Sequence, residues 1–175
     1  SGITQFLGFR VNWGEYKVMG LAPYGEPRFV DAILNHLIHV KEDGSYRLHM
    51  DRFLFLEGRS TISETFGAVF GCEVRGQDTE LKQIHMDIAR SIQEVANLIV
   101  MRQAQHLHAI TGATNLCMAG GVSLNSVANG RVLREGPFER VWIQPASNDA
   151  GGSVGAALVA WHHHFGKPHT PVMPD

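Results

Sequence analysis

Two glycine-rich turns, each placed directly after an apolar segment, are the parts of this sequence with the clearest chemical potential. In the first turn, Gly120 and Gly121 follow the apolar run 115–119. Val122 and Asn125 come next, and the amide of Asn125 could contact a base, a ribose or a phosphate. Paired glycines let the backbone approach an anion, and free N–H groups at a helix start favour phosphate. Glycine turns are also typical of tight strand–helix packing, so both interpretations stay open.

The second turn combines a carboxylate with small residues. Asp149 stands just before a predicted helix whose first residues include Gly151 and Gly152. Small residues at this point let a ligand or another helix come close. An Asp in this position is typical of a helix N-cap. The alternative is that Asp149 is a carboxylate ligand of a divalent metal on nucleotide phosphates.

A strand–glycine–helix pattern surrounds both turns. Strands are predicted over 115–119 and 140–144, and the helices that follow them over 122–136 and 150–165. This alternation predicts an α/β fold with parallel strands. Because ligands of open α/β sheets bind beyond the carboxyl ends of the strands, we expect the two turns to meet at one site.

A long helix is predicted over residues 79–111, with Asp78 as its N-terminal cap and Gly112 at its end. We expect it to pack across a sheet or a neighbouring lobe. The prediction rests on apolar residues spaced mostly three or four apart: Leu81, Ile84, Ile88, Ile92, Val95, Ile99, Leu107 and Ile110.

The first part of the chain predicts shorter elements. Helices are expected over 14–24 and 27–37, and a polar turn over 41–45. Residues 46–56 predict two short strands or one bent ribbon, and residues 60–70 a weak helix.

Composition excludes several classes of protein. Hydrophobic residues make up 44% of the 175, which supplies a core and argues against disorder. A net charge of −2 does not suggest a nucleic-acid partner, and the apolar runs fall far short of the ~20 residues that span a bilayer. Two cysteines without a C-x-x-C pair favour a reducing, cytoplasmic setting. The proline-containing segment 166–175 is expected to be a flexible tail.

Four segments in order resemble the O-carbamoyltransferases of the nodulation-protein and antibiotic-biosynthesis type. They are GEYKVMGLAPYG (14–25), DIARSIQ (87–93), AGGVSLNSVANG (119–130) and QPASNDAGGSVGAA (144–157). Together they cover nearly the whole chain, which makes the resemblance far more specific than a single glycine pair.

The resemblance implies a fold and a reaction. The fold would be an actin/sugar-kinase/Hsp70-like (ribonuclease H-like) lobe. Residues 1–175 would form the second lobe of a nucleotide-binding domain, and the first lobe and the carbamoyl-adenylate-forming domain would be absent. The family makes carbamoyl-adenylate from carbamoyl phosphate and ATP, and it transfers the carbamoyl group to a hydroxyl of a small molecule.

The resemblance implies which residues would bind the nucleotide. Gly120, Gly121 and Asn125 would hold it, and the neighbouring backbone of the two turns would contribute. Glu15 and Lys17 would lie near the ribose and phosphate, although a Glu and a Lys in one helical turn could also be a solvated pair.

The resemblance also implies a metal. Asp149 would be a ligand of iron(II), with magnesium or manganese as alternatives. The other family ligands come from a His-x-x-x-His motif, and no such spacing occurs among these ten histidines. We therefore expect the chain alone to be inactive and to bind metal weakly.

Two alternatives are kept beside the carbamoyltransferase. One is a sugar- or acetate-kinase-like phosphotransferase lobe, and the other is a non-catalytic assembly module in which the glycine turns only pack helices. A homo-oligomer is a further expectation, because a lobe that exposes its cleft face could self-associate.

Overall fold

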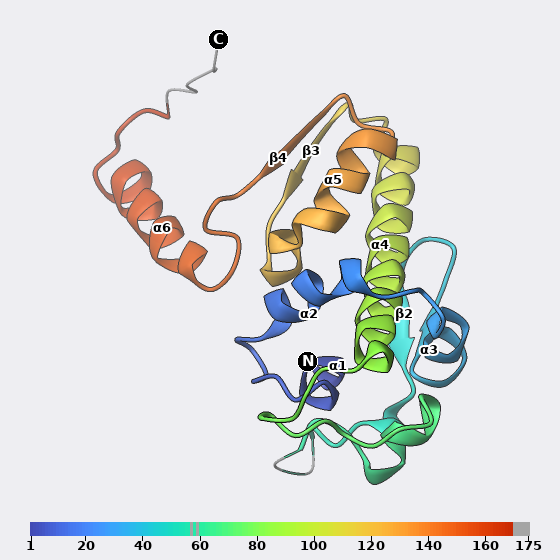
Figure 1. Cartoon of the computed structure of the whole chain (residues 1–175). Helices are drawn as coiled ribbons and strands as arrows, with labels where there is room; N and C mark the ends of the chain where they lie inside the picture. Colours follow the sequence, from blue (N-terminus) through green and yellow to red (C-terminus); the bar gives the residue numbers. More distant parts are fainter. Residues whose placement is uncertain (57, 59, 170–175) are drawn as a thin grey trace.

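The molecule is arranged along one helix, α4 (Gln83–Thr111), which runs through most of its length (Figure 1). The computed structural model describes residues 1–56, 58 and 60–169. Elements from the first part of the chain pack against one half of α4, and a small parallel sheet with its helix packs against the other half. In the described ranges, no helix is long and apolar enough to cross a membrane.

The ends of α4 test the sequence prediction for 79–111. The helix begins four residues later than predicted, because Gly76 and Thr79 close a separate turn, and Lys82 is the N-cap. The main-chain N–H of Lys82 donates to Nδ1 of His85 at 2.9 Å, so the prediction that Asp78 caps this helix was wrong. The C-terminal prediction is confirmed: Gly112 adopts the left-handed conformation, and its N–H donates to His108.

The first part of the chain forms short elements. A hairpin of two antiparallel strands surrounds the polar turn 41–45, in which Asp43 accepts the N–H of Ser45. The strands predicted over 46–56 were only partly right, because one partner strand precedes the turn and Phe53 instead bridges Ile62. The elements are α1 (Gly2–Phe6), α2 (Glu15–Leu21), η1 (Ala22–Tyr24), α3 (Val30–His36), β1 (Ile38–Val40), β2 (Tyr46–Leu48), η2 (Met50–Arg52) and η3 (Glu64–Val69).

The second part of the chain follows the predicted strand–glycine–helix pattern twice. The strands β3 and β4 pair in parallel, with Asn115 opposite Arg140, which confirms a mixed α/β fold with parallel strands. The sheet has two strands, and α5 crosses between them and packs on α4. The elements are β3 (Asn115–Met118), η4 (Gly121–Leu124), α5 (Ser126–Glu135), β4 (Arg140–Ile143), α6 (Ala150–Val159) and η5 (Ala160–His164).

Two separate apolar clusters stabilise these two parts. The larger cluster surrounds Phe6, Phe66 and Ile88, all of them 0% exposed. The smaller cluster joins the parallel sheet to α4 and α5 through Leu116 and Val132. The helix α4 contributes side chains to both clusters, so it is the element that links them.

The last helix, α6, stands apart from the sheet (Figure 1). None of its residues is buried, and Val154 and Leu158 are exposed. After η5 the chain folds back, and the N–H of Lys167 donates to the carbonyl of Trp161. Of the tail predicted to be flexible, 166–175, residues 170–175 lie outside the described residues.

Candidate functional site

The two glycine-rich turns lie side by side at the carboxyl ends of β3 and β4. The N–H of Gly120 donates to the carbonyl of Ser147 at 2.7 Å, and the N–H of Gln144 donates to Met118 at 3.1 Å. These bonds continue the parallel ladder past the last paired residues. The sequence prediction that both turns lie at the same edge therefore agrees with the geometry.

The first turn leaves its backbone open to solvent. Gly120 has a φ of 100°, a conformation that residues with a Cβ rarely adopt. A Cβ on Gly121 would meet no atom within 4 Å. Within the described part of the chain, the N–H groups of Gly121 and Val122 donate to no protein acceptor. The turn thus presents two adjacent main-chain donors that a phosphate oxygen could accept from.

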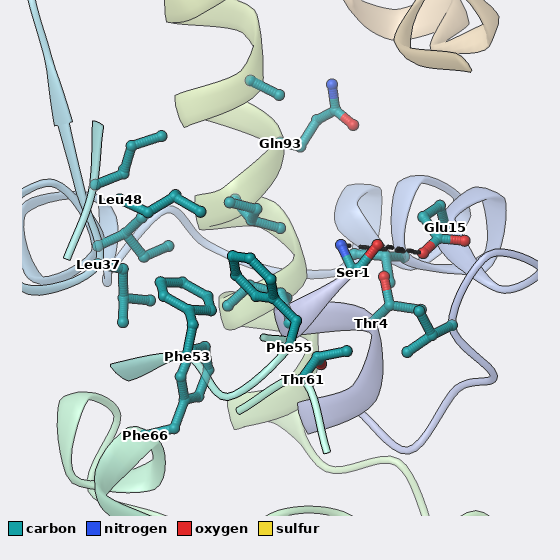
Figure 2. Close-up of a pocket in the computed structure, with 18 of the residues that line it drawn as sticks. Ser1, Thr4, Glu15, Leu37, Leu48, Phe53, Phe55, Thr61, Phe66 and Gln93 are labelled. Carbon is teal, nitrogen blue, oxygen red and sulfur yellow. Dashed lines mark hydrogen bonds and ion pairs between the residues drawn. The ribbon is translucent and has the colours of Figure 1, made fainter. Parts of the chain in front are cut away.

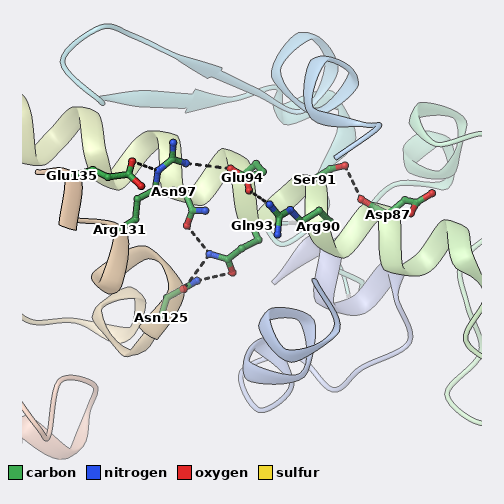
Figure 3. Close-up of polar contacts among 9 residues, drawn as sticks. All are labelled: Asp87, Arg90, Ser91, Gln93, Glu94, Asn97, Asn125, Arg131 and Glu135. Atoms are coloured by element: carbon green, nitrogen blue, oxygen red, sulfur yellow. Dashed lines mark hydrogen bonds and ion pairs between the residues drawn. The ribbon is translucent and has the colours of Figure 1, made fainter. Parts of the chain in front are cut away.

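Asn125 acts as the cap of α5, and a helix-to-helix amide contact fixes its orientation (Figure 3). Its Oδ1 accepts from the N–H of Ala128 at 3.0 Å. Its amide pairs with that of Gln93 on α4 through two bonds of 3.1 Å, and Gln93 also donates to Asn97. The nucleotide contact of Asn125 stays a prediction, since most of its hydrogen-bonding capacity is used by these neighbours.

The second turn satisfies its own backbone. The N–H groups of Gly151 and Gly152 donate to the carbonyls of Asn148 and Asp149 at 2.9 and 3.0 Å. A Cβ on Gly151 would lie 2.5 Å from the carbonyl oxygen of Ala146, so glycine is required there for packing. These N–H groups are less accessible to a phosphate than those of the first turn.

Asp149 is exposed at the position before α6, and its side chain makes no capping hydrogen bond. Among the described residues, no group of three or more His, Cys, Asp or Glu side chains could hold a metal ion. Because iron(II) requires several donors and this part of the chain supplies one carboxylate, the described residues do not by themselves fit a metal.

Glu15 and Lys17 do not form the solvated pair that their spacing allowed. Both are described residues, and no ion pair joins them; Lys17 is exposed. The carboxylate of Glu15 accepts the N–H of Asn12 at 3.1 Å. Partial burial acts to raise the pKa of Glu15, but the hydrogen bond from Asn12 and other nearby donors outweigh it, and the pKa lies below its ordinary value. Glu15 is therefore ionised at neutral pH.

A cavity of about 630 Å³ lies beside α4, and the sequence did not predict it. Figure 2 shows Leu37, Leu48, Phe53 and Phe66 on one side of it and Glu15 on the other. Glu15 and Asn125 are the predicted site residues that line it. No sequence signal could have found the cavity, because its walls come from segments that are far apart along the chain.

Asp87, the first residue of the segment 87–93, anchors the loop that follows α2. Its carboxylate is 1% exposed and accepts the N–H of Glu26 at 2.9 Å, the amide of Gln83 at 2.9 Å and the guanidinium of Arg28 at 3.1 Å. Burial acts to raise the pKa of Asp87, but these three donors outweigh it, so the pKa lies below its ordinary value. The role of this segment in the described structure is positional.

Most of the chain is similar to proteins of one family. The family model described as Carbamoyltransferase N-terminus matches residues 1–158. The uncharacterized protein sll1178 of Synechocystis is 49% identical over the whole chain. The nodulation protein NolO of Bradyrhizobium diazoefficiens is 37% identical over 94% of the chain, and NolNO of Sinorhizobium fredii is 37% identical over 89%. The chain spans 28%, 28% and 21% of the lengths of these three relatives.

Proposed function

Because the chain belongs to the carbamoyltransferase family, we propose that it is part of an enzyme that transfers a carbamoyl group to a hydroxyl of a small molecule. The family match confirms the resemblance to nodulation-type carbamoyltransferases and favours this reaction over phosphoryl transfer. The donor in the proposal is carbamoyl-adenylate, made from carbamoyl phosphate and ATP. An actin-like arrangement of two lobes belongs to the same proposal.

The observation that carries the proposal is the meeting of the two turns, joined by the bond from Gly120 to Ser147. The N–H groups of Gly121 and Val122 would hold the phosphate oxygens of the adenylate. Such donors are fixed by the backbone, so they need no reorganisation when charge builds up on the leaving phosphate. The backbone of Gly151 and Gly152 would form the opposite wall.

In the proposed transfer, the carbamoyl carbon gains a bond to the acceptor oxygen and loses its bond to the phosphate oxygen. The acceptor hydroxyl oxygen attacks the carbamoyl carbon, its proton passes to solvent, and the bond from that carbon to the phosphate oxygen breaks. AMP leaves with the electron pair. The contribution of this chain is to bind and orient the adenylate and to stabilise the negative charge of the departing phosphate.

The other predicted residues have narrower roles in the proposal. Asp149 would contribute a single carboxylate to a metal whose other ligands lie outside the described residues, and no step of the transfer is assigned to it. Lys17, with its exposed ammonium, is the candidate for a longer-range contact to phosphate. Because its carboxylate is ionised, Glu15 would accept a hydrogen bond from a hydroxyl but would repel a phosphate.

The direct test is Gly121→Asp in the complete natural protein. The side chain enters open space, so the melting temperature should not change, while its charge opposes phosphate. Affinity for AMP, measured by calorimetry, should fall about tenfold or more. Gly20→Asp is the matched control, since a Cβ there also meets no atom within 4 Å. Unchanged AMP binding by Gly121→Asp would refute the proposed phosphate site.

The reaction itself is tested by product analysis. Incubation of the complete protein with ATP, carbamoyl phosphate and an acceptor alcohol should release AMP together with the carbamoylated alcohol. Release of ADP with a phosphorylated acceptor would instead support the kinase alternative and overturn the proposal.

A further inference from the structure

We infer that the cavity beside α4 binds the apolar body of the acceptor, and that the acceptor is a neutral alcohol with a substantial apolar portion. This inference rests on the proposed function and deepens it, because it assigns a substrate class to the cavity next to the proposed adenylate site.

The walls of the cavity suit an apolar ligand. Leu37 and Leu48 come from the β1–β2 hairpin region, Phe53 and Phe55 from the segment after it, and Ile92 from α4. Figure 2 shows Leu37, Leu48, Phe53 and Phe55 gathered on one side of the space. A volume of about 630 Å³ is within the range of small-molecule sites, which bind mainly through burial of apolar surface.

The polar groups of the cavity lie toward α2 and the start of α5. Glu15, Gln93 and Asn125 supply a carboxylate and two amides there. An ionised Glu15 accepts a hydrogen bond from a hydroxyl but repels a phosphate or a carboxylate. The chemistry therefore selects a neutral hydroxyl compound and disfavours ATP, AMP and carbamoyl phosphate in this space.

The position of Asn125 relates the cavity to the glycine turn. Asn125 lines the cavity and also ends η4, the short helix that begins at Gly121. The hydroxyl of Ser126 donates to the sulfur of Met19 at 3.8 Å, so the start of α5 lies beside α2. The polar end of the cavity thus lies one short helix away from the proposed phosphate donors, which suits an acceptor hydroxyl approaching the adenylate.

The test uses 1-octanol and octanoate as probes, titrated by calorimetry into the complete natural protein without ATP or carbamoyl phosphate. We expect saturable octanol binding at one site and about tenfold weaker octanoate binding. Ala96→Phe, which adds a ring to the cavity wall, should abolish octanol binding. Leu133→Phe is its control, because Leu133 is exposed on α5 and does not line the cavity.

Glu15→Gln keeps the test decisive if Ala96→Phe fails to fold. Glu15 lies on the surface of α2, so this substitution should leave the fold intact. Loss of the carboxylate charge should reduce the preference for octanol over octanoate to less than about threefold. Absence of saturable octanol binding, or equal binding of the two probes by the unaltered protein, would overturn the inference. Because the titration needs no carbamoyl donor, octanol binding with no carbamoyl transfer would refute the proposed function alone.

Discussion

Replacing Asp87 should destabilise the fold in a graded way that follows its hydrogen bonds. Oδ1 accepts from the N–H of Glu26 and the amide of Gln83, and Oδ2 accepts from Arg28. Asp87→Ala removes the acceptor of all three donors at a site that is 1% exposed, so the free energy of unfolding should fall by about 3 kcal/mol. Asp87→Asn keeps one oxygen that can accept from two of the donors, but it loses the negative charge. The free energy of unfolding should therefore fall by about 2 kcal/mol.

Removing Arg28, the exposed partner of Asp87, should affect stability much less than removing Asp87. Its side chain is 68% exposed, so Arg28→Ala should cost no more than about 1 kcal/mol. Asp31→Asn, at an exposed position of α3, should change stability by less than about 0.5 kcal/mol. Urea denaturation followed by circular dichroism measures all four variants. The reasoning fails if Asp87→Ala costs less than about 1 kcal/mol, or if Asp87→Asn costs no more than Arg28→Ala.

Three further predictions concern the same region and its neighbours. The stability that Asp87 contributes should be present above its ordinary pKa of 3.8 and lost as the pH falls through its lower folded pKa, so the stabilities of the unaltered protein and of Asp87→Asn should converge as the pH falls below 3.8. Gly25→Ala places a Cβ 2.0 Å from the carbonyl oxygen of Met86, so soluble yield and melting temperature should both drop; an unchanged melting temperature would contradict the packing of η1 on α4. Asn125→Ala removes the cap of α5 and should cost about 1 kcal/mol, and a double-mutant cycle with Gln93→Ala should show a coupling of about 0.5 kcal/mol or more; strict additivity would argue against the amide pair.

The second half of the chain was the more predictable from sequence, for a local reason. The apolar runs before Gly120 and before Asp149 are short, continuous and followed at once by turn residues and a helical pattern. Each strand and its following helix are neighbours along the chain, so local patterns determine them. The parallel pairing then follows from the crossover helix α5, and the two turns must share an edge.

The long helix shows where a pattern misleads. Its apolar stripe is buried at Ile88 and Val95, but Leu107 and Ile110 are 41% and 67% exposed. Several polar residues of α4 are buried instead. Two of them, Asp87 and Ser91, accept the main-chain N–H groups of Glu26 and Phe29 in the segment that packs on the helix. The spacing of apolar residues identifies the helix, but it does not identify which polar residues lie on its buried face.

The cavity and the exposure of Asp149 could not be predicted from the sequence, because both depend on long-range placement. The cavity requires residues of the hairpin, α2 and α4 to enclose one space. The exposure of Asp149 results from the position of α6, which makes no buried contact. A sequence can indicate that a carboxylate precedes a helix, but not how many other ligands will lie near it.

The helix α4 packs on two apolar clusters of unequal size, so its two halves should differ in their stability against local unfolding. The cluster around Phe6 and Phe66 is much larger than the one that holds Leu116 and Val132. Local opening of the sheet half should therefore require less free energy than global unfolding. Backbone amides near Ala104 should exchange with deuterium faster than those near Ile88, so the glycine turns belong to the part of the molecule that opens first.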